Sequence, residues 1–310
     1  MPSTTTERNV RHRRKRTGLL APLLEDLLQS PVNVEDDEDL KFLNTLLRKM
    51  YLRETERQNG KAVFSPSALS QCLRKVYLTR HSDELGVSRM RSTKMQPNFY
   101  FLKGNWIHVQ WQFACWKLHR KLPDDVYELL DVEHRITSKR GDHGGTVDVL
   151  NRVYGEHLIV DFKGLNVRDF GNIVRGGSSG YELQLSDYMV LKNSEIGSAI
   201  PRMERALLLT ENKGGPDSKH PIALHETIVE LDEWLPNVKH RLGVLREHET
   251  KEEIPAPECE STGTYQFTGC PFRGYCKAEV KKIQEERKRM EGGDSEYRLA
   301  RPPSRKGSKR

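Results

Sequence analysis

Two aspartates and a lysine lie in a stretch with the pattern of a β-hairpin. Residues 146–150 and 158–162 are β-prone runs joined by a glycine-containing turn, and each run holds one aspartate, Asp148 and Asp161. Because side chains alternate along a strand, Asp161 and Lys163 are expected on the same face. Two carboxylates and a lysine on one face are suited to holding a hard divalent cation beside a phosphate.

A simpler interpretation is that the aspartates are solvated turn and edge-strand residues and that Lys163 is their ion-pair partner. Against it, Asp161 directly follows the apolar run 158–160, which is typical of a buried strand. A carboxylate there is costly unless it is paired or bound to a metal.

The element before the hairpin is predicted to be a strand over 126–136, and a helix over 104–118 precedes that strand. The helix carries His108 beside its apolar stripe, and the strand carries Glu133, which is either a strand-face charge or a support for the site. The stripe consists of Ile107, Trp111, Ala114 or Cys115, and Leu118.

After the hairpin, the Gly- and Ser-rich range 166–180 is expected to be a loop over the site. A helix over 181–191 follows, in which Gln184 and Tyr188 share a face. Strands are predicted over 204–210 and 225–231, with a helix over 232–248.

The N-terminal part is predicted to be helical over 19–58, with a stripe of Leu40, Leu43, Leu47 and Met50 as core or as a packing lid. Ser65 and Pro66 begin a further helix that runs to residue 78 and carries Cys72. The range 82–100 is polar and irregular, with Arg89, Arg91 and Lys94 as residues for a phosphate backbone.

The cysteines favour a metal site over disulfides. The chain has five, an odd number, and no export signal. Cys259, Cys270 and Cys276 lie in a Gly/Pro-containing loop, and with Cys72 they make four, the usual count for an iron–sulfur cluster or a structural zinc. Cys115 is expected to pack in the core.

The overall composition favours a polyanionic partner. The chain has 310 residues, a net charge of +7 and a pI near 9.1. Basic runs at 11–16 and 301–310 are expected to be disordered, and the first either binds nucleic acid or only solubilises the chain. No membrane span or secretory h-region is expected, so a cytoplasmic protein is predicted.

Taken together, these residues resemble a known family. His108, Gly145-x-x-Asp148, Asp161-x-Lys163 and Gln184-x-x-x-Tyr188 occur in the order of the RecB-type branch of the PD-(D/E)XK nucleases. The helix around Cys72 and the run Cys270-Pro-Phe-Arg-Gly-Tyr-Cys276 resemble its iron–sulfur subset, which includes CRISPR-associated RecB-like exonucleases and phage exonucleases. The resemblance covers residues 63 to 280.

The sequence departs from this family at two points. Leu73 follows the first cysteine, where the family usually has proline. Cys259 is also much further from Cys270 than the usual Cys-x-x-Cys, and Phe267 occupies the expected cysteine position. Either Cys259 reaches the cluster through the longer loop or the site has lost a ligand, and we expect the first.

The resemblance implies an α/β, restriction-endonuclease-like fold, with a mixed central sheet flanked by helices. The expected organisation is a basic arm (1–18), a helical extension (19–60), a nuclease domain closed by four cysteines (61–285) and a basic tail (286–310). It implies Mg²⁺ or Mn²⁺ on His108, Asp148, Asp161 and the Phe162 carbonyl, and a 4Fe–4S cluster, with zinc as the alternative, on Cys72, Cys259, Cys270 and Cys276. Lys163, Gln184 and Tyr188 complete the expected catalytic set, and Arg74, Lys75 and Arg273 are candidates for DNA phosphate binding.

The function that this resemblance implies is a metal-dependent DNA exonuclease that acts at DNA ends, chiefly on single strands. It would serve recombination, repair or replication in the cytoplasm of a bacterium or a phage-infected host, with a recombination or helicase partner. The alternatives are a non-enzymatic DNA-end-binding adaptor with the same fold, and an endonuclease or CRISPR spacer-processing subunit. The complete set of catalytic residues argues against the adaptor.

Overall fold

A five-stranded mixed sheet forms the centre of the protein. The computed structural model describes residues 18–27, 32–59, 64–88, 97–176, 180–195, 199–215, 224–259 and 265–292. The strands are β1 (Tyr127–Thr137), β2 (Gly144–Val153), β3 (Glu156–Leu165), β4 (Arg205–Asn212) and β5 (Leu224–Glu230), and they lie in this order across the sheet.

The strand pairing follows from the connections. Adjacent strands are antiparallel except β3 and β4, which are parallel. Parallel neighbours need a crossover, and here α7 (Val167–Val174) and α8 (Gly180–Asn193) supply it. The expected mixed central sheet flanked by helices is confirmed by this arrangement.

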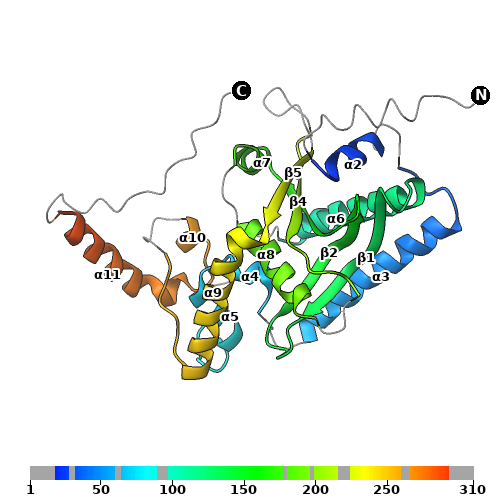
Figure 1. Cartoon of the computed structure of the whole chain (residues 1–310). Helices are drawn as coiled ribbons and strands as arrows, with labels where there is room; N and C mark the ends of the chain where they lie inside the picture. Colours follow the sequence, from blue (N-terminus) through cyan, green and yellow to red (C-terminus); the bar gives the residue numbers. More distant parts are fainter. Residues whose placement is uncertain are drawn as a thin grey trace, which may run out of the picture.

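Alternation along the strands divides the core between the two faces of the sheet. On one face, Val149, Val160 and Phe162 pack with residues of α2 (Ala21–Leu27) and α6 (Pro97–Lys121). On the other face, Leu150 and Ile159 pack with α8. The site residues on β2 and β3 are therefore held between two helical layers (Figure 1).

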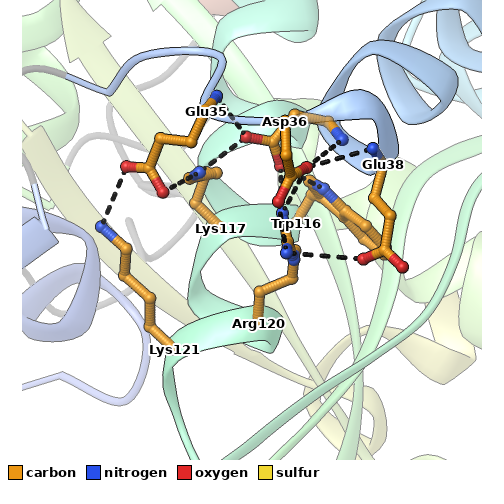
Figure 2. Close-up of polar contacts among 8 residues, drawn as sticks. Glu35, Asp36, Glu38, Trp116, Lys117, Arg120 and Lys121 are labelled. Atoms are coloured by element: carbon orange, nitrogen blue, oxygen red, sulfur yellow. Dashed lines mark hydrogen bonds and ion pairs between the residues drawn. The ribbon is translucent and has the colours of Figure 1, made fainter.

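The helix α3 (Asp37–Asn59) is fixed to the last turns of α6 by an acidic first turn. Asp36 Oδ1 accepts hydrogen bonds from the backbone N–H groups of Glu38 and Asp39, which stabilises the start of the helix. Asp39 is fully buried and accepts hydrogen bonds from Trp116, Lys117 and Arg120 of α6. Figure 2 shows Lys117 and Arg120 directed at the acidic turn.

The remaining helices are grouped beside α8. They are α4 (Pro66–Leu69), α5 (Leu73–His81), α9 (Leu231–Lys251), α10 (Tyr265–Thr268) and α11 (Arg273–Gly292). Figure 1 shows α5, α9, α10 and α11 on the side away from α3. None of the helices within the described ranges combines the length and apolar character that a membrane span needs.

Several predictions for the helices were wrong. Leu40 and Leu47 are 49% and 43% exposed, because the buried stripe of α3 runs through Leu46, with Leu43 and Met50 partly buried. The helix expected from residue 65 to residue 78 is broken before Cys72 into α4 and α5.

The loop predicted over 166–180 contains α7, because the Asn166 side chain accepts a hydrogen bond from the Asp169 N–H and caps a helix whose apolar residues Phe170 and Ile173 are buried. At the other end of the chain, α11 continues to Gly292, past the expected start of the tail at 286. The basic runs 11–16 and 301–310, and Arg89, Arg91 and Lys94, lie outside the described residues.

Candidate metal centre

The two aspartates lie where β2 and β3 separate. The paired residues of these strands end at Val149 and Val160, and Asp148 and Asp161 are the next residue on each strand. The side chains are only 4% and 3% exposed. The Phe162 N–H, which has no β2 partner, donates instead to Asp148 Oδ2 at 2.8 Å. The end of the β2–β3 ladder thus brings two buried carboxylates close to each other.

Lys163 contacts Asp161, as the alternation of side chains predicts. Its Nζ lies 2.6 Å from Asp161 Oδ2 and 5.5 Å from the centre of the Tyr181 ring. Gln184 of α8 donates from Nε2 to Asp161 Oδ1 at 3.2 Å. Asp161 is therefore held from two elements, and the lysine ammonium is kept beside it.

His108 reaches the same point from α6. Its Nδ1 lies 3.1 Å from Asp148 Oδ1, and the imidazole is one-fifth exposed. The apolar stripe that buries α6 against the sheet, with Ile107 and Trp111 both under 10% exposed, fixes this orientation.

Glu133 joins His108 and Asp148 in the tightest group of potential ligands. Among the described residues these three side chains form a set whose ligand atoms all lie within 4.8 Å of one another. Glu133 is buried and has a left-handed φ of 51°, between Val132 and His134, which pair with Val149 and Val147 of β2. Glu133, for which the sequence indicated a strand-face charge or a support for the site, is therefore a candidate metal ligand.

Gln112 links the members of this group. Its Nε2 donates both to Glu133 Oε1 at 2.8 Å and to the Asp148 carbonyl at 2.9 Å. Gln112 is not among the site residues predicted from the sequence, although its position four residues after His108, on the same helical face, is a signal for it. The backbone conformation of Glu133 has no comparable signal in the sequence.

The charges in the site favour a bound cation. Burial raises the pKa of Asp148, but the charge and hydrogen bond of His108, the Lys163 charge and the Phe162 N–H together outweigh burial and bring the pKa to about 2. Burial raises the pKa of Asp161, with a further contribution from Asp148, despite the opposing effect of Lys163. Burial lowers the pKa of His108, but Asp148 raises it to a larger net extent. One added divalent cation would relieve the repulsion between the two carboxylates.

Tyr188 lies next to the site but faces the backbone. Its hydroxyl donates to the Thr146 carbonyl at 2.8 Å, and a Cβ on Gly145 would lie 2.9 Å from its ring. Glycine at this position therefore lets α8 approach β2 closely. These contacts make Tyr188, 6% exposed, a support for β2 rather than a surface for DNA.

The structure brings the four predicted cysteines together. Cys259 and Cys276 are buried in one apolar cluster with Phe267, and Cys270 packs against it. Burial, together with the charges of Cys72, Cys270 and Cys276, raises the pKa of Cys259 to about 11. Cys115 is fully buried in the main core, as expected for a packing residue.

The expected phosphate-binding residues differ in their surroundings. Arg74 is 7% exposed at its side chain, and its Nη1 lies 2.7 Å from Glu279 Oε2, so the predicted phosphate contact does not fit this buried position. The Arg74 guanidinium opposes the rise that burial gives to the pKa of Cys276. Lys75 is partly exposed, and Arg273 donates to the Thr268 carbonyl.

No protein-family model matches the sequence, and comparison with curated proteins gives no match. Two solved structures have similar backbones. The crystal structure of a protein designated SSO0001 has a TM-score of 0.41 at 17% identity, covering 76% of this chain and 95% of its own. An alkaline exonuclease from Laribacter hongkongensis has a TM-score of 0.37 at 13% identity, covering 61% and 92%. At these TM-scores neither structure bears on the chemistry of this chain.

Proposed function

We propose that the protein is a metal-dependent DNA exonuclease that hydrolyses phosphodiester bonds at DNA ends, with single-stranded DNA as its main substrate and a role in recombination, repair or replication. The observation that carries this proposal is the convergence of Asp148, Asp161, Glu133 and His108 at the end of the β2–β3 ladder, with Lys163 beside them. The net positive charge of the chain suits a polyanionic substrate.

The donor set fits a hard divalent cation. Carboxylate oxygens are the ligands that Mg²⁺ prefers, and an imidazole is accepted more readily by Mn²⁺. His108, Glu133, Asp148 and Asp161 would hold the ion, with the Phe162 carbonyl as a further ligand implied by the family resemblance. Such an ion neutralises charge on the phosphate and lowers the pKa of a bound water.

Lys163 would stabilise the negative charge that develops on the phosphate. Burial lowers its pKa, but Asp161 and Asp148 raise it to a larger net extent, so the side chain stays protonated and acts as a hydrogen-bond donor. Asp161 and the Tyr181 ring keep the ammonium in place. Gln184 orients Asp161, and Gln112 orients Glu133, so both carboxylates are held before substrate arrives.

We propose further that Cys72, Cys259, Cys270 and Cys276 hold a 4Fe–4S cluster, with zinc as the alternative. Four cysteine thiols, two of them buried, are the usual ligand set for either an iron–sulfur cluster or a structural zinc. A buried thiol with a raised pKa ionises readily only beside a cation, so metal binding would release protons here. Bound metal would join residues nearly 200 positions apart in sequence, roughly as a long-loop crosslink does.

The experiment is the digestion of end-labelled linear single-stranded DNA with Mn²⁺ or Mg²⁺, beside a closed circle of the same sequence. Asp161→Asn is the test variant, and Asp169→Asn, an exposed aspartate on α7, is the matched control. We expect the intact protein and the control to degrade the linear strand, and EDTA and Asp161→Asn to stop degradation.

Survival of the circle supports an exonuclease, whereas its cleavage supports the endonuclease alternative. A protein that binds DNA but degrades neither substrate contradicts the proposal and favours the adaptor. Equal activity in Asp161→Asn contradicts the assignment of the site.

A further inference from the structure

Arg241 on α9 contacts both chain segments that lead to the first two cysteines. Its Nε donates to the Leu69 carbonyl at 2.6 Å, and its Nη2 donates to the Gln71 carbonyl. The same Nη2 lies 3.1 Å from Glu258 Oε2. The guanidinium thus joins the break between α4 and α5 to the residue directly before Cys259.

Glu258 completes this connection from the other side. Its Oε1 accepts a hydrogen bond from the Leu73 N–H at 3.2 Å. The Gln71 carbonyl and the Leu73 N–H belong to the two peptide groups that flank Cys72. Both flanking peptide groups of Cys72 are therefore bound by the Arg241–Glu258 pair, and Glu258 is covalently next to Cys259.

We propose that the Arg241–Glu258 pair is a polar clasp that holds Cys72 and Cys259 in position for a thiolate-bound metal. This inference rests on the four-cysteine site of the proposed function and assigns its positioning residues. Because Arg241 lies on α9, the clasp would attach the segments of Cys72 and Cys259 to a helix that carries none of the cysteines.

The clasp accounts for the unusual position of Cys259. A cysteine in a tight Cys-x-x-Cys is positioned by its neighbour along the chain, whereas Cys259 is separated from Cys270 by a long loop. Without another constraint, metal binding would have to order this segment, and the loss of conformational entropy would weaken the binding. Arginine suits the task because its planar guanidinium fork can bind two carbonyls and a carboxylate at once.

The test is metal retention in the full chain. Arg241→Met removes the guanidinium and keeps an unbranched side chain of similar reach. Arg246→Met is the matched control, because Arg246 lies on the same helix and pairs with Asp142 at 3.2 Å, away from the cysteine segments. Iron, acid-labile sulfide and zinc per chain are measured, followed by the rate of metal release into a chelator and the visible absorption spectrum.

We expect about 10- to 100-fold faster release from Arg241→Met, the range typical of residues that orient metal ligands. Arg241→Lys should lie in between, because lysine keeps the charge without the fork, and Arg246→Met should match the unmodified protein. Sulfide accompanying the iron identifies a cluster, and zinc without sulfide identifies a zinc site.

Equal release rates from Arg241→Met and Arg246→Met would overturn the clasp. If Arg241→Met does not fold, Glu258→Gln decides, because it keeps an oxygen for the Leu73 N–H and loses only the charge facing Arg241. A metal content that Cys259→Ser leaves unchanged overturns the four-cysteine site and the clasp with it. DNA hydrolysis, measured on the same preparations, tests the nuclease independently.

Discussion

Replacing Asp39 with asparagine should destabilise the fold without altering the metal site. Asp39 is fully buried and accepts hydrogen bonds from the Trp116 indole at 3.0 Å, from Lys117 at 2.7 Å and from the Glu35 N–H at 2.9 Å. Lys117 is itself only 2% exposed. Figure 2 shows its side chain among the residues of the acidic turn. The substitution keeps the shape and removes the charge that Lys117 faces.

The magnitude follows from the burial of the remaining cation. Removing one partner of a buried ion pair costs about 3–5 kcal/mol. Lys117 keeps Glu35 at 2.9 Å, an exposed carboxylate, so the lower end applies, about 3 kcal/mol. At about 2–4 °C per kcal/mol, the melting temperature should fall by roughly 6–12 °C.

The loss should also depend on pH. Burial raises the pKa of Asp39, but hydrogen bonds from Lys117, the Glu35 N–H and Arg120 lower it well below its ordinary value of 3.8. A carboxylate whose pKa is lowered by folding stabilises the native state fully above its unfolded pKa. The difference in unfolding free energy between the native protein and Asp39→Asn should therefore be constant above about pH 5 and shrink below about pH 4.

The assay is denaturant unfolding followed by circular dichroism across this pH range. Asp36→Asn is the control, because Asp36 is exposed and pairs with Arg120 at the surface, so its loss should cost much less than the loss of Asp39. Equal losses in the two variants, or a difference that does not change between pH 6 and pH 3, would refute the reasoning.

Three further outcomes are expected near the site. Gln112→Leu removes the amide that donates to both Glu133 and the Asp148 carbonyl. It should weaken Mn²⁺ binding by about 10- to 100-fold in calorimetry, and unchanged affinity would contradict its role. Gly145→Ala places a methyl group 2.9 Å from Tyr188 and should cost about 1–3 kcal/mol in thermal unfolding; a neutral result would show that α8 can move. Lys163→Met should abolish hydrolysis while Mn²⁺ still binds; loss of binding instead would make Lys163 a structural partner of Asp161.

The sequence predicts the sheet because its signals there are local. The apolar run 158–160 ends at Asp161, and a glycine lies in the turn between the two strands. His108 lies beside the apolar stripe of a helix. The five predicted strands are all present, with bounds that differ by a few residues. The contact between Asp161 and Lys163 follows directly from the alternation of side chains.

Other features depend on tertiary contacts. The helix expected through Cys72 is broken because Arg241 and Glu258 bind the peptide groups at the break. In α3 the buried stripe contains Leu46 and not the expected Leu47, a shift of one residue. The ion pair between Asp39 of α3 and Lys117 of α6 sets the rotation of the helix. Glu133 enters the site through a left-handed backbone that no residue type at this position predicts.

The central claim is that the end of the β2–β3 ladder binds a divalent cation that hydrolysis requires. The most direct measurement is Mn²⁺ binding by electron paramagnetic resonance, together with single-strand hydrolysis, for the native protein and Asp148→Asn. Asparagine keeps an acceptor for the Phe162 N–H, so the fold should persist. We predict that the native protein binds Mn²⁺ and degrades DNA and that the variant loses both. Undiminished Mn²⁺ binding in Asp148→Asn would contradict the account.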